Sequence, residues 1–215
     1  MNYFHSEKYI WILPERTGSR ALGQLLNFWV GEKYCNSNAQ EIGRKKDIRG
    51  NFIQFYSHDW NLVYKDAQDY TFCLTVRNPY ARMLSYYKSI FLKKNCKDKE
   101  CKYTFSEFVK TSMIENKRIW HLEYENVFNE TKIDYIIHLE NIEEELMQVP
   151  MIQQKYTESE EFRKEWDRVI KNNIFDKESK NNYTKVSNED AQIIYDCFPK
   201  QFELFGYSKD SWMYL

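Results

Sequence analysis

The 215-residue sequence has no surplus of positive charge, no even set of cysteines and no long apolar segment. A net charge of -1 argues against a general nucleic-acid binder, although it leaves room for a local basic pocket. No apolar run approaches the roughly 20 residues that a membrane-spanning helix needs. Residues 1–8 lack the layout of a signal peptide, so we expect a soluble, cytoplasmic protein.

The five cysteines are scattered, which is not the pattern of a disulfide framework. Cys73 lies within an apolar segment, so we expect it in the core. Cys96 and Cys101 flank a charged loop without further close zinc ligands. We interpret these two as loop thiols, with a local disulfide as the alternative in an oxidising compartment.

Apolar segments and helical patterns alternate along the chain, which has 42% hydrophobic residues and so enough material for a core. Strands are predicted at residues 9–13, 51–56, 70–76 and 135–139. Helices are predicted at residues 21–29, 79–94, 142–148 and 158–172, and in segments that begin near residues 104 and 187. This order predicts an α/β fold of three layers, with a mostly parallel sheet flanked by helices. Repeats and linkers are absent, so we expect one domain over residues 1–215.

Three of the predicted helices carry local start signals. Asn78 is a suitable N-cap residue, and Pro79 suits the first helical position. Thr104 and Glu107 have the spacing of a capping box, and Ser187 with Asp190 caps the last long helix. That helix is expected to kink or restart at a proline, Pro199.

A candidate anion site follows the first predicted strand, where the chain reads Arg16-Thr17-Gly18-Ser19-Arg20 and then enters a helix. Backbone amides and the helix dipole favour an anion at such a helix start. Gly18 allows close approach of the backbone, while the hydroxyls and guanidinium groups add donors and charge. The alternative is an ordinary turn with two solvated arginines.

A second candidate site follows the strand at residues 70–76, where Arg77 stands at the mouth of the next helix. Arg82 and Ser85 share one face of that helix. Ligands of such sheets bind beyond the carboxyl ends of the strands, so these groups could hold a second phosphate. A solvated helix with an N-terminal arginine is the alternative.

The two motifs together resemble those of sulfotransferases that use 3'-phosphoadenosine 5'-phosphosulfate (PAPS). Residues 16–19 are similar to the family's 5'-phosphosulfate loop, and residues 76–87 are similar to its 3'-phosphate motif. Weaker similarity extends to residues 138–144 and to residues 202–207, the latter resembling the branch that modifies carbohydrates. The chain departs from the family at position 15, where Glu15 replaces the usual proline.

The resemblance implies a P-loop-like sulfotransferase fold, PAPS as the sulfate donor, a hydroxyl acceptor, with a carbohydrate favoured, and no metal. Donor binding is then assigned to the residues Arg16, Thr17, Gly18, Ser19, Arg20, Arg77, Ser85, Lys180 and Tyr183. Arg16 would also stabilise the leaving phosphate oxygen, because negative charge develops there. His58, placed between the nucleotide motifs as in the uronyl 2-O-sulfotransferase branch, is the candidate base, and His121 is its rival.

Other classes of protein fit the sequence less well. Residues 18–25 have the glycine spacing of a kinase-type P-loop without its Lys and Ser/Thr, and a Gly-x-Gly-x-x-Gly motif for dinucleotides is missing. A non-catalytic module of the same fold that binds a sulfated or phosphorylated partner would also retain Arg16, Arg77 and Ser85. Only the base distinguishes that module from an enzyme.

Overall fold

The computed structural model describes residues 2–6, 9–14, 16–30, 45–46, 53–54, 69–88, 104–115, 132–171 and 185–215. The chain divides into two compact units. The first contains Met1–Val76 and Glu125–Asn181, and the second contains Arg77–Tyr124 and Asn182–Leu215. The polypeptide therefore passes from the first unit to the second between Val76 and Arg77.

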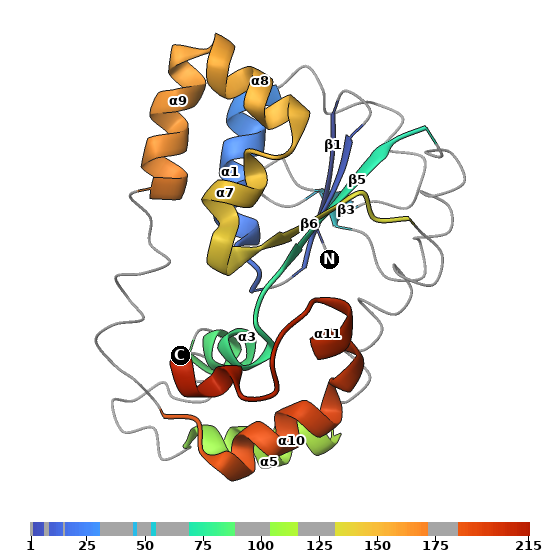
Figure 1. Cartoon of the computed structure of the whole chain (residues 1–215), viewed down its shortest axis with the longest axis vertical. Coiled ribbons are helices and arrows are strands. Elements are labelled where there is room, and N and C mark those ends of the chain that lie inside the picture. The colour runs from blue at the N-terminus through green and yellow to red at the C-terminus, as the bar shows by residue number, and fades with distance from the viewer. Residues whose placement is uncertain are drawn as a thin grey trace. The chain divides into compact units, whose positions relative to one another are not determined.

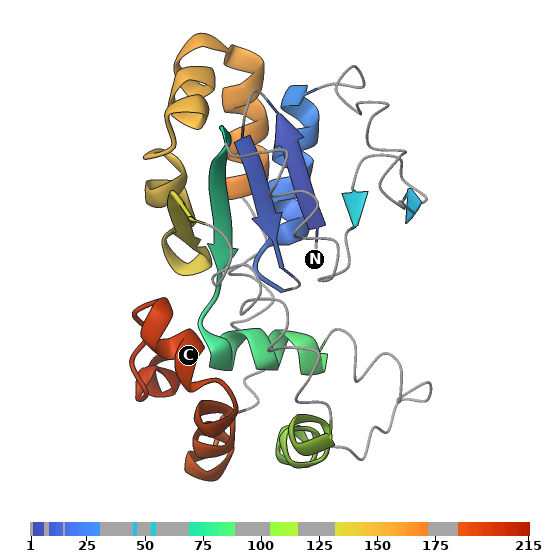
Figure 2. The same cartoon turned by 90° about the vertical axis from the view of Figure 1, so that its right-hand side faces the viewer.

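The first unit contains a mixed sheet (Figure 2). Its strands are β1 (Asn2–Ser6), β2 (Tyr9–Leu13), β3 (Lys45–Lys46), β4 (Ile53–Gln54), β5 (Thr71–Val76) and β6 (Tyr135–His138), in the order β3-β4-β1-β2-β5-β6. Strands β2, β5 and β6 are parallel, and β1 pairs antiparallel with both β2 and β4. The predicted α/β fold with a parallel sheet is confirmed, whereas the antiparallel strand β1 was not predicted.

The helices of the first unit are α1 (Ser19–Val30), α7 (Ile142–Leu146), α8 (Pro150–Glu158) and α9 (Glu160–Trp166), with a π-helical turn at Asp167–Lys171. The helix predicted at residues 158–172 begins two residues later, at Glu160, as α9. Ser159 is its cap, because the Ser159 hydroxyl accepts the Phe162 amide at 3.1 Å. Helix α8 was not predicted.

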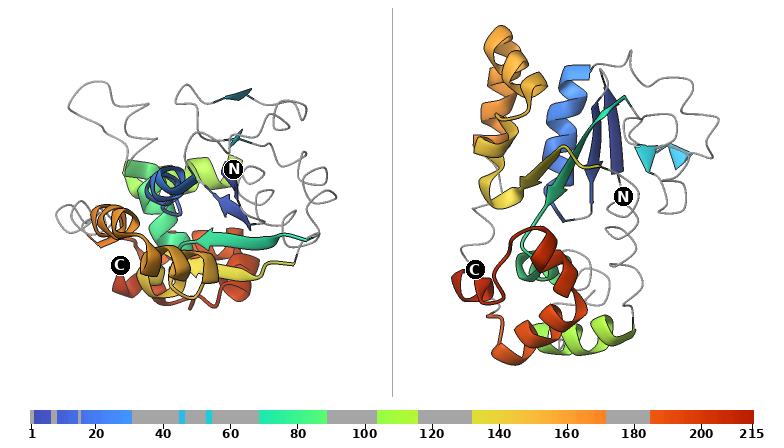
Figure 3. Two further views of the ribbon diagram at one scale, coloured as in Figure 1. Left: turned by 90° about the horizontal axis from the view of Figure 1, so that it is seen from above. Right: turned by 45° about the vertical axis from the view of Figure 1, so that its right-hand side comes forward.

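Helices α1, α8 and α9 gather on one side of the sheet (Figures 1 and 3). Trp11 and Cys73 project from the strands into a core shared with these helices, together with Leu22 of α1 and with Phe162 and Trp166 of α9. The alternate strand residues Ile10, Ile12, Phe72 and Leu74 are buried as well. Both faces of β2 and β5 are thus covered, as is usual for parallel strands in α/β proteins.

The second unit is helical, with α3 (Pro79–Tyr86), α5 (Phe105–Glu115), α10 (Asn188–Cys197), α11 (Pro199–Leu204) and a 3-10 turn at Ser211–Tyr214. Its core is rich in aromatic side chains, and the rings of Tyr80 and Phe202 lie 4.9 Å apart. Pro199 starts α11 directly after α10, as predicted. None of the helices in the described ranges has the length and apolar character needed to span a bilayer.

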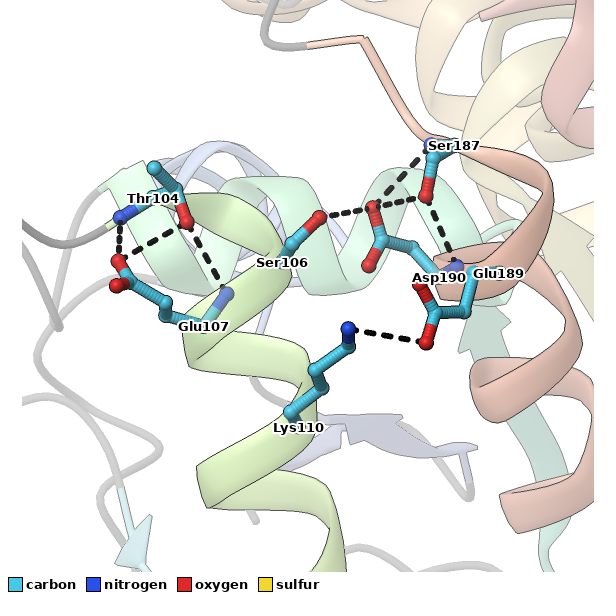
Figure 4. A network of polar contacts seen from close by, with 7 residues as sticks. All are labelled: Thr104, Ser106, Glu107, Lys110, Ser187, Glu189 and Asp190. Carbon is cyan, nitrogen blue, oxygen red and sulfur yellow. Dashed lines mark hydrogen bonds and ion pairs between the residues drawn. The ribbon is translucent and has the colours of Figure 1, made fainter.

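Two capping boxes begin α5 and α10, which lie side by side (Figures 1 and 4). In the first, the Thr104 amide donates to the Glu107 carboxylate at 2.6 Å, and the Glu107 amide donates to the Thr104 hydroxyl at 3.2 Å. In the second, the Asp190 amide donates to the Ser187 hydroxyl at 3.1 Å, and the Ser187 amide donates to Asp190 at 3.2 Å. Both predicted caps are confirmed by these bonds. They could be predicted because their signals are local in sequence.

Candidate functional site

The loop between β2 and α1 holds a strained arginine. Arg16 has a φ of 69° and Gly18 a φ of 78°, both in the left-handed region. Glycine adopts this region at no steric cost, whereas an L-residue such as arginine adopts it only with steric strain. The Gly18 carbonyl accepts the Leu22 amide at 3.1 Å, so Gly18 directly precedes the first turn of α1. The loop therefore leads its backbone into the first turn of a 12-residue helix, where amide groups favour an anion.

A pair of buried threonines anchors this loop to the sheet. The Thr17 hydroxyl donates to the Pro14 carbonyl at 2.8 Å and lies 2.8 Å from the Thr75 hydroxyl on β5. Both threonines are almost fully buried. In this conformation, the Thr17 hydroxyl bonds within the first unit and fixes the loop against the end of β5. The role of Thr75 was missed, although a hydroxyl at the end of an apolar strand is a usable signal.

The start of α3 follows directly on β5. Asn78 caps the helix, since its side-chain oxygen accepts the amides of Tyr80 at 3.0 Å and Ala81 at 3.5 Å. Arg77, immediately before the cap, and Ser85, two turns later, are half-buried. Arg82 is buried, with 3% of its surface exposed. The predicted cap at Asn78 and the predicted proline at the first helical position are both present.

These two motifs lie within a sequence match that covers almost the whole chain. The sequence model described as the sulfotransferase family matches residues 4–208. This chain belongs to the sulfotransferase family. The protein is thus a transferase of sulfuryl groups, and its family implies a sulfate donor and a hydroxyl acceptor. Comparison with curated proteins and comparison with solved structures gave no match.

Several predicted site residues of the sulfotransferase lie outside the described residues, namely His58, His121, Lys180 and Tyr183. The base and the adenine loop therefore stay predictions. Arg20 is the second residue of α1, and Ser19, the first, is half-buried.

The weaker segment of family similarity at residues 138–144 lies at the carboxyl end of β6. The His138 ring nitrogen Nδ1 lies 3.0 and 3.1 Å from the two carboxylate oxygens of Glu145. Asn141 donates to the same carboxylate at 3.3 Å. His138 is thus a hydrogen-bonded strand histidine, and its partner Glu145 was not predicted.

The other weaker segment, residues 202–207, ends α11. Phe202 and Phe205 are buried, and Gly206 has a φ of 68°. The Tyr207 amide donates to the Phe202 carbonyl at 3.0 Å and the Gly206 amide to Glu203 at 3.4 Å, which is the Schellman pattern. This segment terminates α11 and directs the chain into residues 208–215.

Two cysteines, Cys73 and Cys197, fall within the described part of the chain, and both are buried. Burial, with a smaller contribution from the charge of Asp134, raises the pKa of the Cys73 thiol. A raised pKa leaves little thiolate, the reactive form, so Cys73 serves the core as predicted. Cys96 and Cys101 lie outside the described residues.

Proposed function

We propose that this sulfotransferase transfers a sulfuryl group from PAPS to a hydroxyl group of a carbohydrate. The left-handed backbone of Arg16, at the start of α1, carries the proposal. A non-glycine residue with this strain points to a functional requirement for its side chain. The similarity of residues 202–207 to the carbohydrate branch supports the choice of acceptor.

The donor is proposed to bind through both motifs. Arg16, Ser19, Arg20 and the amides of the loop would bind the phosphosulfate, while Arg77 and Ser85 would bind the 3'-phosphate. The family match over residues 4–208 includes both motifs, which supports a single donor for them.

Lys180 and Tyr183 are proposed to close over the adenine base, as the family resemblance implies. Because side chains would supply the positive charge that the sulfuryl and phosphate groups need, the proposed reaction uses no metal.

The transfer is proposed to proceed in line. His58 removes the proton of the acceptor hydroxyl while the oxygen of that hydroxyl bonds to sulfur. The bond between sulfur and the 5'-phosphate oxygen breaks at the same time. The products are the sulfate ester and 3'-phosphoadenosine 5'-phosphate (PAP). Arg16 stabilises the negative charge that develops on the leaving oxygen. His121 is the alternative base.

Nucleotide selectivity tests this proposal, because PAP and AMP differ by the 3'-phosphate alone. Isothermal titration should give a Kd for PAP at least about tenfold below that for AMP, since charge-assisted bonds hold the extra phosphate. The variant Arg77→Ala should bind the two nucleotides equally. Equal affinities in the unchanged protein would contradict the assignment of the 3'-phosphate site.

The variant His58→Ala serves as the matched control in the same experiment. It should keep the preference for PAP, because His58 is proposed to act on the acceptor, and should lose about 10²–10⁴-fold in transfer rate. Mass spectrometry of a glycan panel incubated with PAPS measures the transfer. Unchanged turnover would move the role of base to His121.

A further inference from the structure

The segment at residues 208–215 is hydrogen-bonded to the first turn of α3 within the second unit. The Asn78 side-chain amide donates to the Ser211 hydroxyl at 2.8 Å. The Ser211 hydroxyl in turn donates to the Ser208 carbonyl at 2.6 Å. A second bond runs from the Tyr80 hydroxyl to the Lys209 carbonyl at 2.7 Å. Two residues of the α3 start are therefore tied to one segment more than 120 positions later.

The bond to Ser211 fixes which way the Asn78 amide faces. Its oxygen caps α3, so its nitrogen must point away from the helix, and Ser211 accepts from that nitrogen. Because the Ser211 hydroxyl donates its proton to the Ser208 carbonyl, it can act only as an acceptor toward Asn78. Asn78 is 5% exposed, so an amide turned the wrong way would leave buried polar groups without partners.

The Tyr80 bond adds a second constraint on the same helical turn. The Tyr80 ring packs on Phe202, and the Lys209 ammonium lies 4.9 Å from the centre of the Tyr195 ring. Burial, followed by the charges of Asp210, Tyr195 and Asp196, raises the pKa of Tyr80 to about 12. Tyr80 therefore stays protonated and remains a hydrogen-bond donor at neutral pH.

We propose that Ser211 is a positioning residue for recognition of the donor's 3'-phosphate, acting through Asn78 on Arg77 and the first turn of α3. This inference rests on the proposed function, which assigns the 3'-phosphate to Arg77. Arg77 is bonded directly to Asn78 in the chain, so an ordered cap orders the backbone from which the Arg77 side chain departs. A pre-ordered site binds its ligand more tightly, because less conformational entropy is lost on binding.

The test compares the Kd values of PAP and AMP for the full chain and its variants. Ser211→Ala should raise the Kd for PAP by about two- to tenfold, the worth of one neutral hydrogen bond, and leave the Kd for AMP unchanged. Ser211→Thr keeps the hydroxyl and should have the same ratio of the two Kd values as the unchanged protein. Tyr80→Phe, which removes the second bond and keeps the ring, should raise the Kd for PAP relative to that for AMP, as Ser211→Ala does.

Ser208→Ala is the matched control. The Ser208 hydroxyl accepts the Asp210 amide at 3.1 Å, and its carbonyl, the partner of Ser211, is unchanged by the substitution. This variant should keep the unchanged protein's ratio of Kd values.

The outcomes separate the two proposals. Equal binding of PAP and AMP by the unchanged protein would overturn the proposed function and this inference with it. A preference for PAP that is lost in Arg77→Ala and kept in Ser211→Ala would overturn the positioning role of Ser211 alone. Equal weakening of both nucleotides in Ser211→Ala would also overturn it, since that is the effect of a general loss of structure.

Discussion

Arg16 holds a backbone conformation that L-residues other than asparagine and aspartate rarely adopt. The left-handed region costs such a residue about 1–2 kcal/mol, and glycine avoids that cost. Part of the gain is offset, because glycine loses more entropy on folding by about 0.5–1 kcal/mol. For the backbone alone, we therefore expect Arg16→Gly to raise the free energy of unfolding in urea by zero to about 1.5 kcal/mol. Its sulfuryl transfer should fall by about 10²–10³-fold.

Arg16→Lys is the control for this prediction. It keeps the positive charge and the strained backbone, so it should retain part of the activity at an unchanged stability. If Arg16→Gly instead unfolded more easily by over about 1 kcal/mol, the arginine would be serving the fold rather than the reaction.

At the residue scale, the sequence indicates the candidate groups but not their partners. The hydroxyl of Thr17, a predicted donor to the anion, bonds Pro14 and Thr75, and its part in binding the anion stays a prediction. The pair with Thr75 joins residues 58 positions apart. It depends on the parallel register of β2 and β5, in which Ile12 faces Leu74, and no local pattern encodes that register.

At the scale of elements, Asp190 joins two helices through one oxygen. Its Oδ2 accepts the Ser106 hydroxyl of α5 at 2.7 Å and the Ser187 hydroxyl at 2.7 Å, and the residue is 1% exposed (Figure 4). Asp190→Ala would leave two hydroxyls without this acceptor, so we expect a loss of about 2–4 kcal/mol in the free energy of unfolding in urea. Ser106→Ala removes the link to α5 alone and should cost about 1–2 kcal/mol.

Glu107→Ala is the matched control, because it opens the other capping box at an exposed position. Glu107→Ala should lower the free energy of unfolding by less than Asp190→Ala does. The double variant of Ser106 and Asp190 should cost less than the sum of the single variants, since both remove the same bond. Strict additivity would show that the bond between α5 and α10 contributes nothing to stability.

The elements that were predicted are those with local signals. The caps of α3, α5 and α10 each lie within four residues of sequence, and all were found. Strand β1 was missed because its pairing with β2, and not a hydrophobic alternation of its own, makes it a strand. Helix α8 was missed because Met151 and Ile152 are its only buried residues, which is too few for a helical stripe.

For the whole molecule, the expectation of one domain over residues 1–215 stays a prediction, and the structure divides the chain into two compact units whose chain segments alternate. This division cannot be read from composition, because the crossing between Val76 and Arg77 lies inside a single motif. The proposed donor would bind the loop at residues 16–19 of the first unit and Arg77 with Ser85 of the second.

Hydrogen exchange with and without nucleotide tests the proposed binding of one donor by both motifs. At a concentration 100 times its Kd, a ligand slows exchange through openings that release it by about 100-fold. PAP should therefore protect amides both at the start of α1 and in α3, whereas AMP, which lacks the 3'-phosphate, should protect the start of α1 and leave α3 nearly unchanged. In Arg77→Ala, PAP should give the pattern of AMP. Protection by PAP confined to one unit would mean that the two motifs do not share a donor, because a molecule held at both ends must slow the opening of both.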